Sequence, residues 1–508
     1  MSASLITQAD GEYITIHARR GAAIDRQNCT VKVFPRLSPT SWLTTKTVFS
    51  QLFALLLFAI QAPVLGPKVF GLISIVMVFV GFCENVPGEA AAEALISVRE
   101  IDERHFSTMT TANVLLSVAI GIAVFAGAQR IAGWFGEPEL AAILRWMSVL
   151  PAISAFAAAP IAATKRDMLF QPLALRSIGS LFVGGIVGLV LTLAGAGVWA
   201  LVWQALVTRL VSSIVLWHTV PLKFGMGFST RHFRELAQFA APTLMSRFLT
   251  WSCNQIPRLM LGLYWGSTDL GLFSLASRLG DILMEVAVVP RYAVARVELR
   301  KYASDRAGLD AALRRTFTFL TVFCFPLCIG GAAIVPTLFR VWLDPRWTGA
   351  IVPAQCLLLA CVALVTQYLG GAALLAMNFQ RKEAMVSIAQ TAVTVVAVAA
   401  CAPFGLLAAS IGIAARPFVL LPLSVGLLKR YCAIPASTIF LPQWPPLAAS
   451  LTMGTCVWLL RMTLDGRVTD AVALPLLILA GTAVYTLMVR LTMPTVVARF
   501  ASRIPGRV

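Results

Sequence analysis

The chain has 508 residues, of which 58% are hydrophobic and 13% charged, and its mean hydropathy is +0.81. This composition excludes an ordinary soluble protein and predicts an all-α polytopic membrane protein. The excess of 41 lysines and arginines over 23 acidic residues would indicate nucleic acid in a soluble protein, but here we expect no nucleic-acid partner.

The ten cysteines are scattered singly, and the chain has only four histidines. We therefore expect no metal site, no other cofactor and no disulfide framework.

Residues 1–40 carry mixed charge and lack an apolar run as long as a secretory signal. We interpret them as a cytoplasmic N-terminal tail, or equally well as the product of a mis-assigned start codon. From Trp42 onward, fourteen apolar segments follow, each about 20 residues long, the length of a transmembrane helix. They are 42–62, 66–85, 107–129, 141–162, 172–194, 197–218, 236–264, 268–293, 314–337, 351–377, 383–402, 405–428, 445–463 and 471–492.

The distribution of basic residues predicts the orientation of these spans. When charges at span ends are counted with their loops, the two tails and the even-numbered loops carry 27 lysines and arginines, and the opposite loops carry six. Positive residues favour the cytoplasmic side, so we predict that both termini are cytoplasmic. The Cys83–His105 loop has six acidic residues against two arginines, but acidic residues weigh little in this rule.

The sequence contains an internal repeat. Gly66 and the run Gly71–Ser74 recur two hundred positions later as Gly266 and the run Gly271–Ser274. Because six spans separate the copies, both halves insert the same way round, and such transporters hold substrate between their halves. We predict a tail (1–40), an N-lobe of six spans (41–218), a cytoplasmic linker (219–235), a C-lobe of six spans (236–430) and a last helix pair with a cytoplasmic tail (431–508).

Five charged residues interrupt the hairpin of the seventh and eighth spans. They are Arg247, Arg258, Arg278, Asp281 and Glu285. A charge near the bilayer centre costs roughly 2.5 to 3.5 kcal/mol, so these residues should face a polar cavity or one another. A cavity dominated by arginine suits an anionic passenger.

Depth along the spans selects the candidate binding residues. Arg247 and Arg278 lie near the middle of their spans, and Arg209 and Arg416 lie at matching depths in the sixth and twelfth. We predict that these four arginines and Arg258, which is nearer the periplasmic end, bind a diphosphate, since guanidinium groups do so bidentately. The alternative is that they snorkel to the headgroups or form interhelical ion pairs.

Asp281 and Glu285 follow Arg278 at helical spacing and share its face. They either neutralise Arg278 in a static ion pair, or one of them takes up a proton or cation and couples its flow to transport. Lys46, Arg145 and Arg176 lie close to span ends, where snorkelling explains them.

Four runs of residues resemble the polysaccharide transporter family, whose members are bacterial flippases for lipid-linked oligosaccharide units. They are Trp134–Leu140, Leu144–Trp146, Gly197–Val202 and Leu270–Leu279. The likeness covers about residues 42–430 and extends to the superfamily of multidrug exporters and lipid II flippases. It implies a V-shaped pair of six-helix lobes that alternate between two openings in the inner membrane. Pro257-Arg258 stands where related sequences often carry Asp-Asn, which puts ion coupling through this position in doubt.

The arginines indicate an anionic substrate, and the resemblance implies that it is an undecaprenyl-diphosphate-linked oligosaccharide moved by a flippase. We expect membrane lipid as a partner, together with export machinery such as a polymerase. No G-x-x-x-x-G-K-[ST] loop is present, so we expect no nucleotide hydrolysis. A multidrug exporter is the first alternative, although its cationic passengers would require more acids at depth than Asp281 and Glu285. A polymerase or ligase is the second, but the longest outer loop, around Arg340–Ala350, lacks paired carboxylates.

Overall fold

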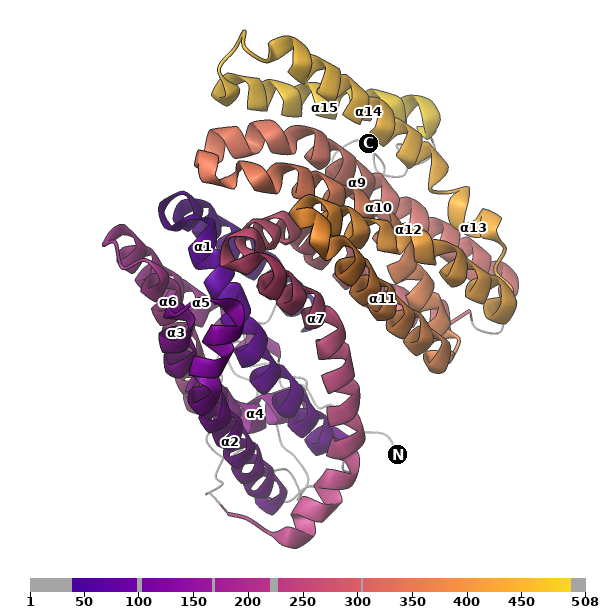
Figure 1. Cartoon of the computed structure of the whole chain (residues 1–508). Helices are drawn as coiled ribbons and strands as arrows, with labels where there is room; N and C mark the ends of the chain where they lie inside the picture. The colour runs from indigo at the N-terminus through magenta and orange to yellow at the C-terminus, as the bar shows by residue number, and fades with distance from the viewer. Residues whose placement is uncertain (1–38, 98–102, 167–169, 220–226, 303–304, 495–508) are drawn as a thin grey trace, which may run out of the picture. The chain divides into compact units, whose positions relative to one another are not determined.

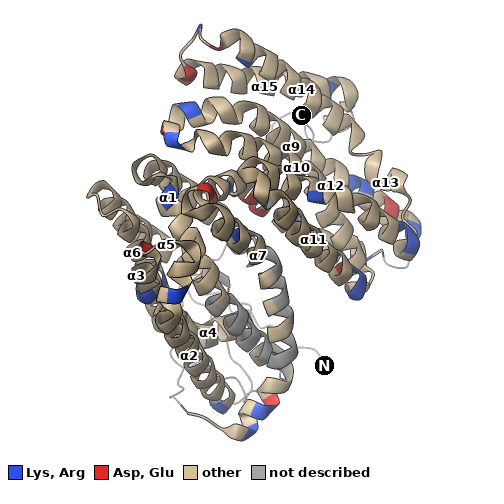
Figure 2. Ribbon diagram, viewed as in Figure 1, with Lys and Arg blue, Asp and Glu red and all other residues tan. Residues whose placement is uncertain are grey.

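The chain is helical over nearly all the residues that the computed structural model describes, which are 39–97, 103–166, 170–219, 227–302 and 305–494 (Figure 1). No strand occurs in these ranges. Eleven helical stretches among them are long and apolar enough to cross a membrane. Figure 2 shows that much of the length of these helices carries neither acidic nor basic residues. The prediction of an all-α membrane protein is confirmed.

The helices follow one another with short connections. The first half of the chain contains α1 (Pro39–Ser97), α2 (Glu103–Phe135), α3 (Glu139–Met147), α4 (Leu150–Arg166), α5 (Phe170–Leu193), α6 (Val198–Thr219) and α7 (Thr230–Leu283). The second half contains the π-helix η1 (Met284–Val288), α8 (Val289–Arg300), α9 (Arg306–Trp342), the 3₁₀-helix η2 (Pro345–Ala350), α10 (Ile351–Ala376), α11 (Gln380–Cys401), the 3₁₀-helix η3 (Ala402–Phe404), α12 (Gly405–Cys432), α13 (Ala436–Phe440), α14 (Trp444–Leu464) and α15 (Asp470–Thr492).

Twelve of the fourteen predicted spans overlap the eleven apolar stretches to within a few residues, since Thr45–Phe82 covers most of the first two. The predicted seventh span lies in α7, and the eighth runs from α7 through η1 into α8; no stretch of these helices is among the eleven. Along its length α7 carries Arg258, Asp269, Arg278 and Asp281. That these two segments cross the membrane stays a prediction.

One predicted boundary was wrong. The Cys83–His105 segment was expected to be a loop, but α1 continues through it to Ser97, since its alanines and glutamates are strong helix formers. The predicted fourth span lies within the apolar stretch Glu139–Thr164, which a short break divides into α3 and α4. The break precedes Pro151, which has no N–H to bond the carbonyl of Met147.

The chain divides into two compact units. Unit 1 consists of two segments, the chain up to Leu65 and Leu72–Leu259. Unit 2 consists of Gly66–Gly71 and the chain from Met260 onward. In unit 1, α2 packs on α3 and α4, α4 packs on α6, and α5 packs on α6. The boundary between the units lies inside α7, whereas the lobe limits from the sequence, 218 and 236, stay a prediction.

In unit 2, α9 and α10 pack together and α12 covers α10. The core between them contains Phe317 and Phe325 of α9, Leu369 of α10 and Leu428 of α12. The last helix pair, α14 and α15, also packs on α9, and the Tyr485 hydroxyl of α15 donates to the carbonyl of Val322 at 2.6 Å.

The other end of this helix pair is held by charges. Arg340 of α9 contacts Asp465 at 3.1 Å and Asp470 at 3.5 Å. Leu479 and Leu491 of α15 are 67% and 68% exposed, as expected of a helix that faces lipid.

The two glycines of the sequence repeat adopt the same backbone conformation. Gly66 kinks α1 with φ 74° and ψ 170°, and Gly266 kinks α7 with φ 78° and ψ −173°. These are conformations that residues with a Cβ rarely adopt. The repeat seen in the sequence is therefore also a repeat of backbone geometry.

The two kinks meet in a reciprocal contact within unit 2. A Cβ added to Gly71 would lie 1.6 Å from the backbone oxygen of Ser267, and one added to Gly271 would lie 1.9 Å from the backbone oxygen of Pro67. Since positions 67 and 71 correspond to 267 and 271 in the repeat, each copy presses a carbonyl onto the glycine of the other. We call this contact the glycine joint.

We expect Gly71→Ala and Gly271→Ala each to destabilise the protein by about 3 kcal/mol, because the clashing atom is backbone and cannot rotate away. Thermal unfolding of the purified protein in detergent measures this loss. Gly426→Ala in α12 is the control, since a Cβ there meets nothing within 4 Å. A similar melting temperature for all three variants would contradict the joint.

Candidate functional site

The charged residues of the second part of α7 lie together in unit 2. Arg278 is half-buried, while Asp281 and Glu285 are exposed. Glu285 interacts electrostatically with Arg278 and, more weakly, with Asp281. Glu285 is thus close enough to Arg278 and Asp281 to interact with both, whereas the shared helix face of the three residues stays a prediction.

Glu285 lies in the π-helix η1, between α7 and α8. Pro290 in the first turn of α8 has no N–H to donate the helical hydrogen bond to the carbonyl of Val286, and in a regular α-helix a proline also crowds the carbonyl four residues before it. A wider turn relieves both problems. π-helical turns are frequent at functional sites, where they alter the direction of a side chain.

Arg416 of α12 is linked to this acidic pair through Tyr368. Its Nη1 donates to the hydroxyl of Thr394 on α11 at 3.0 Å, and its Nε is buried without a hydrogen-bond partner. Tyr368 of α10 interacts electrostatically with Arg416, Asp281 and Glu285. One polar cluster therefore joins α7, η1, α10, α11 and α12. We call it the unit 2 cluster, and its members are Arg278, Asp281, Glu285, Tyr368, Thr394 and Arg416.

Two glutamines hold the helices around the unit 2 cluster. Gln390 of α11 donates to the side-chain oxygen of Gln367 at 3.1 Å, and Gln367 donates to the backbone carbonyl of Pro417 at 2.7 Å. Because Pro417 follows Arg416 directly, this chain of hydrogen bonds fixes the turn of α12 that carries the arginine.

Unit 1 has a separate pair of cations. Arg209 of α6, which is exposed, interacts electrostatically with Arg176 of α5. The Nε of Arg176 is buried and has no hydrogen-bond partner, which differs from the snorkelling expected of this residue. Two guanidinium groups of α5 and α6 are thus near each other within unit 1.

A polar contact also joins three helices of unit 1. Gln61 of α1 donates to the side-chain oxygen of Gln204 on α6 at 2.8 Å and to Thr192 of α5 at 3.4 Å. Gly188 of α5 leaves the space for Gln204, since an added Cβ would lie 2.1 Å from its Oε1.

The structure thus brings together some of the predicted site residues. Arg278, Asp281, Glu285 and Arg416 belong to one cluster in unit 2, whereas Arg209 belongs to unit 1. Arg258 of α7 is half-buried. Arg247 is part of α7, but its side chain lies outside the described residues.

Sequence reasoning missed four neutral members of these contacts: Tyr368, Thr394, Gln367 and Gln390. All four are polar residues inside otherwise apolar spans, and polar groups buried in hydrocarbon require partners. That signal could have identified them. Among the described residues, no group of three or more His, Cys, Asp or Glu side chains could hold a metal ion.

Comparison with known proteins identifies the family. The polysaccharide biosynthesis protein family matches residues 45–352. The chain belongs to this family. The matched region begins in α1 and ends at the start of α10, so it includes Arg209, Arg258, Arg278, Asp281 and Glu285 but not Arg416.

Curated relatives are similar over part of their length. The succinoglycan biosynthesis transport protein ExoT of Rhizobium meliloti is 25% identical over 57% of this chain and 59% of its own. The lipopolysaccharide biosynthesis protein WzxC of Escherichia coli is 23% identical over 63% of this chain and 66% of its own. The matches therefore span less than two thirds of either relative.

Solved structures show the fold. The lipid II flippase MurJ in an inward closed conformation superimposes with a TM-score of 0.73 at 15% identity, covering 90% of this chain and 99% of its own. An inward-facing multidrug resistance transporter of the MATE family, in the MOP superfamily, gives a TM-score of 0.57 over 74% of this chain and 92% of its own. The chain has the fold of these transporters.

We expect Thr394→Val to destabilise the protein by about 2 kcal/mol, because it leaves the buried Arg416 guanidinium without its acceptor. The melting temperature of the purified protein measures the effect. Thr391→Val, one turn earlier on α11, is the matched control, since its hydroxyl is exposed and bonds only Ser387 of its own helix. Equal losses in both variants would show that the hydrogen bond to Arg416 contributes nothing.

Proposed function

We propose that this protein is a flippase that moves an undecaprenyl-diphosphate-linked oligosaccharide from the cytoplasmic to the periplasmic leaflet of a bacterial inner membrane, by alternating access. The observation that carries the proposal is the unit 2 cluster, in which the guanidinium groups of Arg278 and Arg416 lie among polar side chains. The family and the transport function in the name of ExoT support it, and so does the fold shared with MurJ.

The arginines are the proposed ligands of the diphosphate. Arg278 and Arg416 are proposed from the unit 2 cluster, and Arg209, Arg247 and Arg258 are proposed from their positions in the sequence. The guanidinium group suits this role because it stays charged and presents a planar pair of N–H donors to phosphate oxygens. The buried, unpartnered Nε of Arg416 is a donor that such an anion would satisfy.

Asp281 and Glu285 are the proposed partners of Arg278 in the absence of substrate. A carboxylate that offsets a guanidinium group keeps the empty protein stable, since an uncompensated charge in hydrocarbon is costly. When a phosphate takes the place of the carboxylates, they are free to accept a proton or a cation. The same residues can therefore serve both as an ion pair and as a coupling site.

We further propose that both termini are cytoplasmic. The support is the distribution of 27 basic residues in one set of loops and tails against six in the other. The partners that fit this arrangement are membrane lipid, the lipid-linked substrate, and a polysaccharide polymerase with other export machinery.

We expect Arg278→Ala and Arg416→Ala each to reduce export roughly tenfold to hundredfold, the factor that corresponds to one charge-assisted hydrogen bond. Lysine at either position should give an intermediate rate, because it keeps the charge but loses the bidentate geometry. Export is measured as surface polysaccharide in cells that lack the native gene, with protein levels checked by immunoblot.

Arg300→Ala is the matched control for this experiment, since Arg300 is an exposed cation at the end of α8. Normal export in Arg278→Ala and Arg416→Ala, at normal protein level, would refute the binding role of these arginines.

We expect the membrane potential to drive translocation. Two negative charges that leave a negative compartment gain roughly 2.3 kcal/mol each per 100 mV. In proteoliposomes with a potassium diffusion potential set by valinomycin, transport of a labelled lipid-linked oligosaccharide should be faster out of the negative side and slower when the polarity is reversed. Rates that follow a sodium or proton gradient and ignore the potential would contradict this mechanism.

A further inference from the structure

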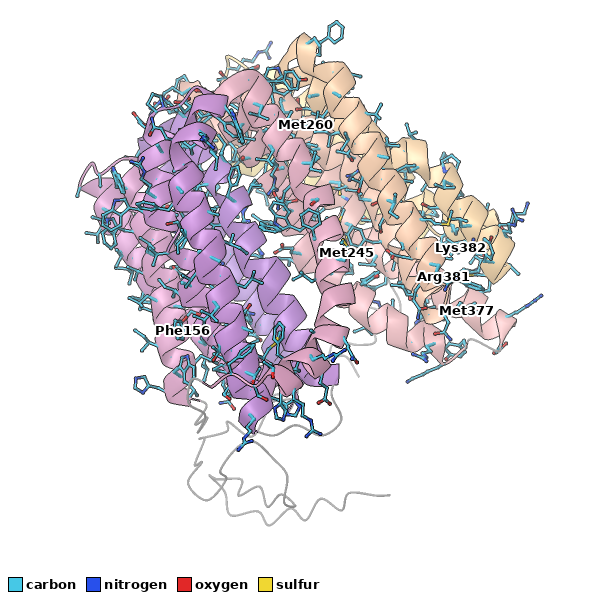
Figure 3. The ribbon with its side chains drawn as sticks, turned by 60° about the horizontal axis from the view of Figure 1, so that its bottom comes forward. Phe156, Met245, Met260, Met377, Arg381 and Lys382 are labelled. Carbon is cyan, nitrogen blue, oxygen red and sulfur yellow. The ribbon has the colours of Figure 1, made fainter. Side chains whose placement is uncertain are left out.

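Four basic residues gather at one end of unit 2, outside the cluster described above. Arg381 and Lys382 lie in the first turn of α11, where Figure 3 labels them side by side, and Lys429 and Arg430 lie in the last turn of α12. Figure 2 shows basic residues concentrated at the end of unit 2 that holds α13. We call these four residues the basic end.

Two aromatic rings lie among these cations. The Nζ of Lys382 lies 4.7 Å from the ring centroid of Tyr431, and the Cζ of Arg430 lies 5.8 Å from the same centroid. The ring of Phe379 lies 5.5 Å from that of Tyr431. A single tyrosine therefore holds two cations near each other, since the face of an aromatic ring attracts positive charge.

The turn between α10 and α11 places Lys382 there. Asn378, with φ 63°, follows the end of α10 in the left-handed conformation, which asparagine adopts more readily than most residues. The chain then reverses into α11, which packs on α12. This packing brings the first turn of α11 against the last turn of α12.

The two helix turns that form the basic end contain four cations and one acid, Glu383 of α11. The Glu383 carboxylate accepts a hydrogen bond from Ser387 of the same helix. In the described part of the chain, no ion pair joins any of the four cations to an acid. The negative end of the α12 dipole offsets part of the charge of Lys429 and Arg430, but it does not offset Arg381 and Lys382 at the start of α11.

The basic end lies where a membrane surface would meet the protein. α11 and α12 are both apolar enough to cross a membrane, over Gln380–Cys401 and Gly405–Cys432, and the four cations stand at the matching ends of these two stretches. Beyond α12, Leu441 and Trp444 are 64% and 66% exposed. Exposed tryptophan beside a helix end is typical of the headgroup layer.

We propose that the basic end is a binding site for the headgroup of an anionic phospholipid in the cytoplasmic leaflet. Lys382 and Arg430, held by Tyr431, contact the phosphate, and Arg381 and Lys429 widen the positive surface around it. The bound lipid relieves the repulsion between the cations and fixes the ends of α10, α11 and α12 at the membrane surface. This inference is independent of the passenger that the protein transports.

The test is to titrate phosphatidylglycerol into the full-length protein in detergent and to measure binding as the rise in melting temperature. Phosphatidylcholine, a lipid without net charge, is the control. The wild type should respond to phosphatidylglycerol and not to phosphatidylcholine. Lys382→Gln combined with Arg430→Gln should weaken phosphatidylglycerol binding roughly thirtyfold, the factor expected for two cations near an anionic surface.

Two further variants separate a built site from general positive charge. Arg300→Gln combined with Lys301→Gln removes two exposed cations at the end of α8 and should leave binding within about twofold of the wild type, since such cations lie outside the site. Tyr431→Leu keeps every charge but removes the ring, and should weaken binding several-fold. The proposal is overturned if the two double variants lose binding equally, if Tyr431→Leu binds as the wild type does, or if the wild type does not distinguish the two lipids.

Discussion

A guanidinium group inside an apolar helix bundle must find polar neighbours in the protein, because hydrocarbon offers none. In unit 2 this requirement determines much of the packing. Arg416 donates a hydrogen bond to the hydroxyl of Thr394. Hydrogen bonds of Gln367 and Gln390 hold the turn of α12 that contains Arg416. Arg278 has Glu285 within electrostatic range. Polar residues of α10, α11 and α12 are therefore arranged around the positions of the cations.

The glycine joint meets a different requirement from that of the buried arginines. It needs the backbones of two helices to approach closely, with no side chain between them. A carbonyl of each repeat rests where the other repeat has no side chain, at Gly71 and Gly271. Dispersion forces between helix backbones are strongest at such short range, and small residues are enriched at helix contacts in membranes for this reason. Each glycine contacts a carbonyl of the other repeat copy, two hundred residues away. A larger residue at either glycine would therefore require the backbone of the other copy to move.

Much of the fold could be predicted from the sequence, because the length of an apolar run determines whether a helix can span a bilayer. Twelve predicted spans coincide with apolar helices of the structure. The positions where helices end were less predictable. Alanine and glutamate extended α1 beyond its apolar part to Ser97, and Gly66 kinked α1 without ending it.

The site was predictable only in part, for a related reason. Charge and depth identified Arg278, Asp281, Glu285 and Arg416, since both can be read along a single helix. The contacts of Arg416 with Thr394, and of Gln390 with Gln367, depend on how α10, α11 and α12 are rotated against one another. Helical periodicity gives no such rotation when apolar residues surround the whole helix. The π-helix η1 likewise depends on how one turn adapts to Pro290.

The charges of the unit 2 cluster bear on whether the transported substrate is a cation or an anion. A transporter for cations needs acids that are available to the cation, but Glu285 already interacts with Arg278, and Asp281 follows Arg278 by three residues. An arriving cation would have to displace a guanidinium group that is part of the same helix, which lowers its affinity. A phosphate at the proposed site would meet the opposite situation, because it would replace the carboxylates at Arg278, and the unpartnered Nε of Arg416 is a further donor in the same cluster. This difference supports the proposal of an anionic headgroup over a cationic drug, by an argument from charge that does not use the family of the chain.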